Sequence, residues 1–334
     1  MSERADDGAE VPCPVCGRPS HQSYPLPASF MKDELARYYE ETLPANLPMS
    51  DYFMYRCPRC TLEFAWPLEE GSSAFYDWIT KHPTYYPDHR WEWGEVKDWL
   101  AAQSSPLNLL EIGSGGGAFL KSLRDLEQVT AIGLDPTVGS AETCRVEGLE
   151  VYAETLADYA ENPTHAVRNF DVIVAFHCLE HIEDPRGLVA DMLKLLTAEG
   201  HLFLSTPYSP MSFEGPWFDP LNHPPHHMTR WNASAYKALA KQFGLHLHLH
   251  LPHTDRTLNR VAWAFNFSLN GPQHLQTRNQ VLLRAIKKPR AFFAEVTRQI
   301  RRERVNGKTA PDVVLAILSR QPWAEAGTRI MPGE

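Results

Sequence analysis

Four of the six cysteines occur in two short pairs, each separated by two residues. Cys13 and Cys16 form one pair, and Cys57 and Cys60 form the other. A Cys-x-x-Cys turn can point two thiolates at one ion, and two such turns complete a tetrahedral site. The spacing predicts a structural zinc ion, because four sulfur ligands leave no position open for water. A pair of redox-active or merely structural thiols is the alternative.

A second candidate site is the stretch LNLLEIGSGGGAFLKSL at residues 107–123. An apolar run predicts a strand, which stops at Glu111, turns through glycines and continues in a helix pattern. Gly113, Gly115 and Ala118 fit the G-x-G-x-x-G/A fingerprint of dinucleotide sites, and Asp135 follows at the distance expected for a ribose contact. Alone, this match is weak.

The same turn also follows a second pattern, in which an acid at the end of a strand precedes Gly-x-Gly-x-Gly. Here the sequence resembles the class I S-adenosylmethionine-dependent methyltransferases. Residues 170–185, FDVIVAFHCLEHIEDP, resemble the segment of that family that runs from an Asp-led strand into Leu-Glu-His and then Asp-Pro. Residues 200–207, GHLFLSTP, resemble the strand that follows it. The order holds over residues 107–207, so the resemblance implies a methyltransferase domain.

The charge at the turn separates the two ligands. A dinucleotide brings a pyrophosphate, which needs amide donors and a helix N-terminus. S-adenosylmethionine has no phosphate but carries an ammonium, a carboxylate and a sulfonium. Glu111 suits a cationic methionine tail and would lie poorly beside a pyrophosphate. Glu111 could instead cap the turn, and Asp135 could be an ordinary loop acid.

The resemblance implies a cofactor site at the carboxyl ends of the strands, where Asp135 would accept the ribose hydroxyls. The positions that it assigns to S-adenosylmethionine are Glu111, Gly113, Ser114, Gly115, Gly117, Asp135, Pro136, Phe176 and His177.

Histidines on the neighbouring loops are candidates for a general base, which a hydroxyl or acidic-carbon acceptor requires. We predict a catalytic role for His181, His226 and His227, with one of the last two as the base. His181 could equally shape the loop by bonding its backbone, and His226 and His227 could be ordinary loop residues.

Residues 221–232, LNHPPHHMTRWN, resemble the PPHH-type loop of one methyltransferase subgroup. Many of its members carry an N-terminal two-knuckle zinc module that ends in a short aromatic strand, as LEFAWP does at residues 62–67. Some act on sugars or carbohydrate-linked molecules. The resemblance therefore implies a small-molecule acceptor, of which a sugar is one class.

Alternating strand and helix patterns from residue 107 onward predict the scaffold for these sites. We expect an α/β fold: a doubly wound, mostly parallel, seven-stranded Rossmann-like sheet with a small zinc ribbon and a helical insertion near the C-terminus. The predicted divisions are a zinc-ribbon-like module with a helical insert at 1–67, an aromatic-rich helical connector at 68–106, and a methyltransferase domain at 107–334 with a basic insertion at about 255–310.

Two other segments allow more than one interpretation. Leucine and histidine alternate in LHLHLHLPH at 245–253, which predicts a strand with a solvated histidine face, although three histidines could also bind a metal. In the connector, Tyr85 and Tyr86 could pack against the next domain or cap an active site.

Charge is unevenly distributed in this chain of 334 residues with a formal net charge of −9. Residues 284–308 hold nine Lys or Arg and only two Glu, which could meet an anionic surface or an acidic partner; a solvated helix is the commoner outcome. General nucleic-acid binding is not expected. We find no transmembrane segment or secretory signal and expect a cytoplasmic protein.

Two rival functions remain open from the sequence. An NAD(P)-dependent oxidoreductase could use the same glycine turn. A non-catalytic binding module could keep a degenerate pocket and recruit partners through its ribbon, although retention of Glu111, the glycines and Asp135 argues against degeneracy.

Overall fold

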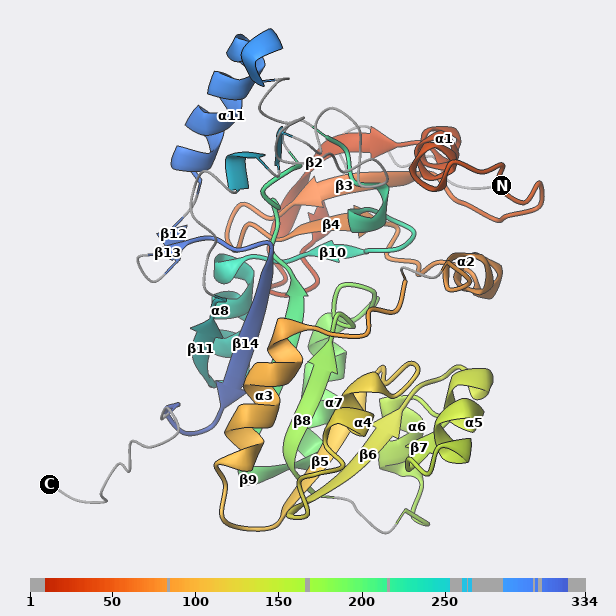
Figure 1. The fold of residues 1–334 in the computed structure, drawn as a ribbon, viewed down its shortest axis with the longest axis vertical. Coiled ribbons are helices and arrows are strands. Elements are labelled where there is room, and N and C mark those ends of the chain that lie inside the picture. Colours follow the sequence, from red (N-terminus) through yellow and green to blue (C-terminus); the bar gives the residue numbers. More distant parts are fainter. Residues whose placement is uncertain are drawn as a thin grey trace, which may run out of the picture.

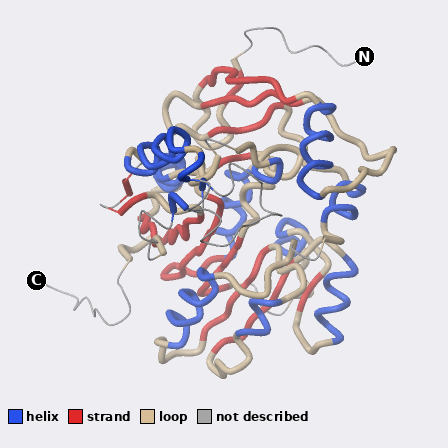
Figure 2. Tube along the Cα trace, turned by 45° about the horizontal axis from the view of Figure 1, so that its top comes forward, coloured by secondary structure: helices blue, strands red, loops and turns tan. Residues whose placement is uncertain are grey.

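The computed structural model describes residues 10–82, 85–165, 169–214, 217–252, 260–262, 264–265, 285–302, 304–305 and 308–323. A large seven-stranded sheet is flanked by helices, and a smaller five-stranded sheet lies beyond one of its ends (Figures 1 and 2). A two-stranded ribbon of β12 (Arg304–Val305) and β13 (Lys308–Thr309) stands apart from both.

The large sheet has the strand order β11-β14-β9-β8-β5-β6-β7. Its strands are β5 (Leu107–Ile112), β6 (Val129–Leu134), β7 (Val151–Tyr152), β8 (Phe170–Phe176), β9 (Leu196–Pro207), β11 (His246–His250) and β14 (Val313–Ser319). Strands β5 to β9 pair in parallel, whereas β14 runs antiparallel to both of its neighbours. The predicted doubly wound, mostly parallel sheet is therefore confirmed.

Helices cover both faces of this sheet because successive strand residues point to opposite sides. Leu109, Val172 and Val174 pack on the face covered by α3 (Trp91–Ala101), α4 (Ala118–Ser122) and α5 (Val138–Val146). Leu110 and Ile173 pack on the other face, under α6 (Leu156–Glu161), α7 (Pro185–Leu195) and α8 (Ala233–Gln242). The near-continuous apolar sequence of β5 and β8 follows from this double burial.

Local capping explains where two of these helices begin. The side chain of Asp184 accepts a hydrogen bond of 2.9 Å from the Gly187 amide, and Pro185 occupies the first helical position of α7. The Asp-Pro pair at the end of the segment 170–185 thus marks the N-terminus of α7. Asn232 caps α8 in the same way.

The small sheet has the order β1-β2-β3-β4-β10. Its strands are β1 (Val11–Pro12), β2 (Pro19–Leu26), β3 (Tyr52–Arg56), β4 (Glu63–Trp66) and β10 (Thr229–Arg230). The predicted helix of the insert is α1 (Ala28–Tyr39), and α2 (Ser73–Ile79) follows β4. Strand β10 comes from the loop after β9, which also contains a 3-10 turn, η1 (Pro220–Asn222). The sequence does not predict this pairing of β10 with β4.

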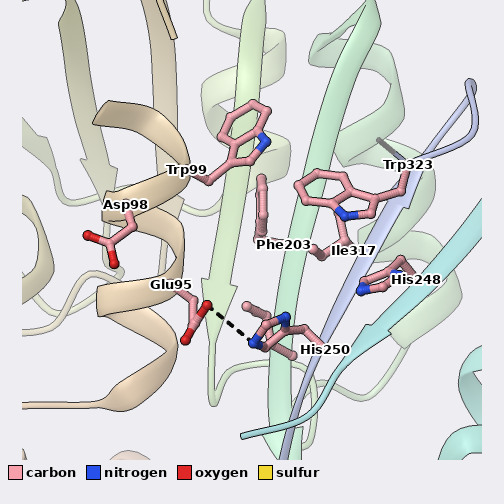
Figure 3. Close-up of a pocket in the computed structure, with 9 residues that line it drawn as sticks. Glu95, Asp98, Trp99, Phe203, His248, His250, Ile317 and Trp323 are labelled. Carbon is pink, nitrogen blue, oxygen red and sulfur yellow. Dashed lines mark ion pairs between the residues drawn. The ribbon is translucent and has the colours of Figure 1, made fainter. Parts of the chain in front are cut away.

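The histidine-leucine strand is less solvated than predicted. His246 is exposed, but His248 stacks on Trp323 with ring centroids 5.9 Å apart, and His250 lies 3.2 Å from the carboxylate of Glu95 on α3. Figure 3 shows His248, His250, Glu95 and Trp323 around a pocket that also includes Trp99 and Phe203. This pocket contains none of the residues expected to bind a cofactor.

Half of the predicted insertion at 255–310 lies outside the described residues, but α11 (Pro289–Ile300) is described. Glu295 and Gln299 are buried, whereas Phe293 and Ile300 are about two-thirds exposed. The side of α11 that faces the rest of the protein is thus partly polar, and the Gln299 amide on it donates to the Ser212 carbonyl at 2.8 Å. Among the described residues, no helix combines the length and apolar character needed to cross a membrane.

Arg230 on β10 connects the small sheet electrostatically to the loop after β9. Its buried guanidinium lies 2.6 Å from Glu214 and 3.3 Å from Glu63 on β4. Burial opposes the charge on Arg230, but Glu214 and Glu63 outweigh it and raise the pKa of Arg230. Removal of one partner from such a buried network leaves the other charges uncompensated.

We predict that Arg230→Met lowers the free energy of unfolding by about 3–5 kcal/mol, because Glu214 would remain buried without its cation. Arg56→Met is the matched control: Arg56 also faces Glu63, at 3.7 Å, but its side chain is 57% exposed, so the loss should be about 0–1 kcal/mol. Urea denaturation of both variants measures the difference. Equal losses would contradict the proposed role of Arg230.

Candidate active site

The glycine turn follows β5 at the point where the strand order of the sheet reverses. From β5 the chain proceeds through β6 to β7 on one side, and β8 then pairs on the other side of β5. Ligands of open α/β sheets bind in the crevice at such a switch point, outside the carboxyl ends of the strands. Gly113, Gly115 and Gly117 all have positive φ, between 50° and 70°, which glycine adopts without strain.

Asp135 follows β6 and is held against the glycine turn. One carboxylate oxygen accepts the Gly115 amide at 2.8 Å, and the other accepts the Thr137 amide at 2.9 Å. These two bonds fix the carboxylate beside the turn. Pro136, the next residue, is exposed.

Glu111, at the end of β5, is a buried acid with incomplete pairing. Its Oε2 has no hydrogen-bond partner among the described residues, and neither does the buried hydroxyl of Ser114. Burial, together with the charge of Asp135, raises the pKa of Glu111 well above its usual value. Two neighbouring acids without a cation between them form a site that favours a positive ligand.

His177 follows β8 directly and has a positive φ of 50°, which is uncommon for a residue with a side chain. Its Nε2 lies 2.8 Å from Glu92 on α3, and its Nδ1 lies 3.4 Å from Glu180. Burial opposes protonation, but hydrogen bonds to Glu180 and Glu92 raise the pKa of His177. Phe176, by contrast, is buried in the core against Phe119, so only its backbone borders the crevice.

The structure brings His181, His226 and His227 together. One ring nitrogen of each lies within 4.8 Å of the others. The loop that carries the last two is held by the Met228 and Thr229 amides, which donate to the Glu180 carbonyl at 2.8 and 3.1 Å. The PPHH loop is thereby pinned to the loop after β8.

These three histidines are neutral. Burial, together with the charge of His181, lowers the pKa of His226 to about 3. Burial also lowers the pKa of His181, and it lowers that of His227 well below its usual value. Neutral imidazoles can accept a proton or bind a metal ion.

Tyrosines from the connector lie between the histidines and the glycine turn. The Tyr85 hydroxyl is 3.2 Å from Nε2 of His226. A Cβ atom added at Gly115 would lie 3.1 Å from the Tyr86 ring, so this half-exposed ring covers the turn. Of the two interpretations left open, a cap over the crevice agrees with these contacts.

The four paired cysteines form a second cluster, away from the glycine turn. Their sulfur atoms all lie within 4.8 Å of one another, with Cys13 3.6 Å from Cys60 and Cys16 3.5 Å from Cys57. The hydrogen bond from Cys60 lowers the pKa of the Cys13 thiol to about 5. Four converging thiols fit a tetrahedral ion.

The two cysteine turns have the same backbone geometry. The Gly17 amide donates to the Cys13 carbonyl at 2.9 Å, and the Thr61 amide donates to the Cys57 carbonyl at 3.0 Å. Gly17 and Thr61 both have positive φ. Thr61 adopts this conformation without being glycine, so the surrounding structure must hold it there.

Several contacts of the site escape sequence reasoning. Glu92 begins a helix without any motif, and its partner His177 lies 85 residues away. Asn222 accepts a hydrogen bond of 2.9 Å from His227, and only the fold brings Tyr76 within 3.5 Å of His181. The one available signal was the Leu-Glu-His motif, which points to Glu180.

Residues 88–250 match a family model described as a methyltransferase domain. A ubiquinone biosynthesis O-methyltransferase of Vibrio atlanticus (strain LGP32) is 32% identical over 104 residues, which cover 29% of this chain and 42% of that protein. One of Xanthomonas oryzae pv. oryzae (strain PXO99A) is 34% identical over 105 residues, with the same coverage. The chain thus spans less than half of these relatives.

Among solved structures, a SAM-dependent methyltransferase from Archaeoglobus fulgidus aligns with a TM-score of 0.42 and 15% identity over 68% of this chain and 93% of that one. The plantazolicin methyltransferase BamL in complex with an analogue and SAH aligns with a TM-score of 0.42 and 13% identity over 69% and 85%.

We predict that Gly115→Ala lowers the free energy of unfolding by about 1–2 kcal/mol, because a side chain is strained at φ 50° and would crowd Tyr86. Gly116→Ala is the control, since its added Cβ meets nothing within 4 Å and its φ is not positive. It should change stability by less than about 1 kcal/mol. Chemical denaturation compares them, and equal effects would contradict the assigned turn geometry.

Proposed function

We propose that the chain is an S-adenosylmethionine-dependent methyltransferase that acts on a small-molecule acceptor. The observation that carries the proposal is the buried, unpaired Glu111 beside Asp135 at the glycine turn, within the region that matches a methyltransferase domain. When bound, the cofactor supplies the methyl group in activated form.

The residues present fit this cofactor. The carboxylates of Glu111 and Asp135 offer acceptors for an ammonium and for ribose hydroxyls, and Oε2 of Glu111 has its full capacity left. The positive φ of Gly113, Gly115 and Gly117 lets the backbone approach a ligand closely. Ser114, Pro136 and the backbone of Phe176 and His177 complete the proposed cofactor set.

The same charges disfavour the oxidoreductase alternative. A pyrophosphate at this turn would add negative charge beside Asp135 and further oppose ionisation of Glu111, whereas a cationic ligand would favour both carboxylates. A degenerate binding module would not need to keep an acid whose burial raises its pKa. Both alternatives remain outcomes of the binding test below.

On the acceptor side we propose the cluster of His181, His226 and His227 as the catalytic group, with the tyrosines of the connector as its cover. The relatives named above are O-methyltransferases of ubiquinone biosynthesis, which supports an acceptor with a hydroxyl group. A sugar or carbohydrate-linked acceptor stays a prediction from the PPHH-type loop.

We also propose that the four-cysteine cluster binds a structural zinc ion and marks the subgroup with an N-terminal zinc ribbon. The matched turns and the converging sulfur atoms support this proposal. The domain divisions, a cytoplasmic location and an anionic partner for 284–308 stay predictions. In the basic segment 284–308, Arg301 is exposed and so is available to an anionic partner. Arg302 is not, because it donates to the Ala310 carbonyl at 2.8 Å.

We predict that Asp135→Ala weakens binding of S-adenosylhomocysteine roughly 10- to 150-fold, because a charged acceptor worth about 1.5–3 kcal/mol is lost. Isothermal titration calorimetry measures this affinity, and NAD serves as the competing ligand. Asp125→Ala is the control, since Asp125 is an exposed acid paired with Lys97 at 2.7 Å.

Tight binding of NAD without binding of S-adenosylhomocysteine would replace the proposal with the oxidoreductase. Binding of neither ligand by the folded protein would favour the non-catalytic module. Unchanged affinity in Asp135→Ala would show that the cofactor lies elsewhere.

We predict that Cys57→Ser lowers the zinc content of the four-cysteine site and destabilises the small sheet, because one of four ligands is lost. Cys144→Ser is the control, since Cys144 lies outside the cluster, beside the Gly115 carbonyl. Mass spectrometry of bound metal and thermal melting report the two effects. Retention of the full four-cysteine zinc in Cys57→Ser would contradict the ligand assignment.

A further inference from the structure

We propose that His181, His226 and His227 bind a divalent transition-metal ion, distinct from the ion of the four-cysteine cluster. One ring nitrogen of each histidine lies within 4.8 Å of the other two. Two of the histidines are nearly fully buried, and the third is half-buried. They come from two loops that the backbone bonds at Glu180 hold together.

Hydrogen bonds at Nδ1 orient all three imidazoles for coordination through Nε2. Nδ1 of His181 lies 2.6 Å from the His226 carbonyl, and Nδ1 of His226 lies 2.8 Å from the Leu221 carbonyl. A carbonyl only accepts, so each Nδ1 must carry the proton, which leaves Nε2 with a lone pair.

His227 follows the same pattern through Asn222. The amide nitrogen of Asn222 donates to Ser209 at 3.1 Å and also to Glu214, so its oxygen faces Nδ1 of His227 at 2.9 Å. Nδ1 of His227 must therefore donate. Metal-binding histidines characteristically donate their second N–H to a carbonyl or a carboxylate, which fixes the tautomer and the ring orientation.

The ring packing also agrees with neutral ligands. The centroids of the His226 and His227 rings are 4.5 Å apart, and the His181 ring lies 4.6 and 4.8 Å from them. Three imidazolium cations could not share this space, whereas three neutral imidazoles can surround one cation.

Glu180 supplies an independent observation. Its side chain is only 1% exposed, and its Oε1 lies 3.4 Å from Nδ1 of His177 and 4.0 Å from Nε2 of His227. A buried carboxylate beside three neutral imidazoles, whose neighbouring cation His177 is shared with Glu92, can accommodate a further positive charge. An ion bound by the histidines would compensate its charge.

The donor set selects the class of ion. Three imidazole nitrogens suit zinc and its first-row neighbours, and such sites keep one coordination position open, unlike a four-cysteine site. The Tyr85 hydroxyl lies 3.2 Å from Nε2 of His226 and would release that nitrogen to the ion.

The role of the ion rests on the proposed function, although its binding does not. Tyr85 contacts the histidines, and its neighbour Tyr86 covers Gly115, so the open position faces the space next to the cofactor turn. The ion would hold an acceptor through an oxygen donor, such as a phenol, a catechol or a vicinal diol, and lower the pKa of that hydroxyl.

The test counts zinc ions on the full-length protein, without any methyl donor. After equilibration in a zinc-buffered solution, we expect two zinc ions per chain in the wild type and one in the double variant His226→Gln/His227→Gln. Cobalt substitution separates the sites, because only thiolate ligands give intense near-ultraviolet charge-transfer absorption. The double variant should keep that absorption and lose the weaker visible bands of the histidine site.

His223→Gln is the matched control, because His223 is a buried histidine of the same loop whose Nε2 faces Arg230 at 2.5 Å instead of the cluster. It should retain two ions. A single zinc in the wild type, or two in the double variant, would overturn the proposal. If the double variant has a lower melting temperature than the wild type, the zinc content of the single variant His181→Gln and of the wild type tests the proposal instead.

Binding of S-adenosylhomocysteine, measured on the same samples, separates this proposal from the previous one. Two zinc ions without S-adenosylhomocysteine binding would contradict the methyltransferase function and support the metal site. Normal S-adenosylhomocysteine binding with one zinc would do the reverse.

Discussion

The pinning of the loop after β9 is the constraint on which the site depends. Its end becomes the fifth strand of the small sheet, where Thr229 and Arg230 pair with Phe64 and Glu63. The Met228 amide meanwhile donates to the Glu180 carbonyl. The loop is thus bound at one short segment to both halves of the molecule. The pairing with β4 and the bond to Glu180 together hold the buried His226 and His227 beside the loop after β8.

This arrangement divides the crevice into two electrostatic halves. Glu111 and Asp135 make the half at the glycine turn acidic, and the pKa of Glu111 rises because burial and Asp135 both oppose its charge. On the other side, burial keeps His226 and His227 neutral. A cationic methyl donor is stabilised by acidic surroundings, whereas an acceptor that must lose a proton needs a neutral base nearby. The fold meets both demands with residues that sit on different loops.

Local patterns in the sequence were sufficient for much of the fold. Alternating apolar runs predicted the strands of the large sheet, and the glycines after Glu111 predicted a tight turn, because both features depend on neighbouring residues. The Cys-x-x-Cys spacing likewise predicted the two cysteine turns. Their convergence on one point was an inference from zinc chemistry, and the sulfur positions agree with it.

The remaining features depend on partners far away in the chain. Strand β10 has only two residues, too few for any periodicity, and exists because β4 offers a free edge. For the histidine-leucine strand, alternation shows which side chains share a face, but not that Trp91 and Trp323 lie against that face. Similarly, nothing near Glu92 signals a partner as distant as His177. Burial of these polar groups is decided by packing, which the local pattern does not encode.

The cysteine cluster and the histidine cluster are mechanically connected, which gives a structural ion a reason to be present in an enzyme. Thr61 closes the second cysteine turn, and its hydroxyl and carbonyl bond the side chain of Asn232, at 3.2 and 3.1 Å. Asn232 in turn caps α8, directly after β10. The proposed ion, held by Cys57 and Cys60, would therefore stiffen the same turn that anchors the end of the histidine loop. Because catalytic groups must be placed to within a fraction of an ångström, rigidity at this anchor affects the acceptor side even though no cysteine touches it.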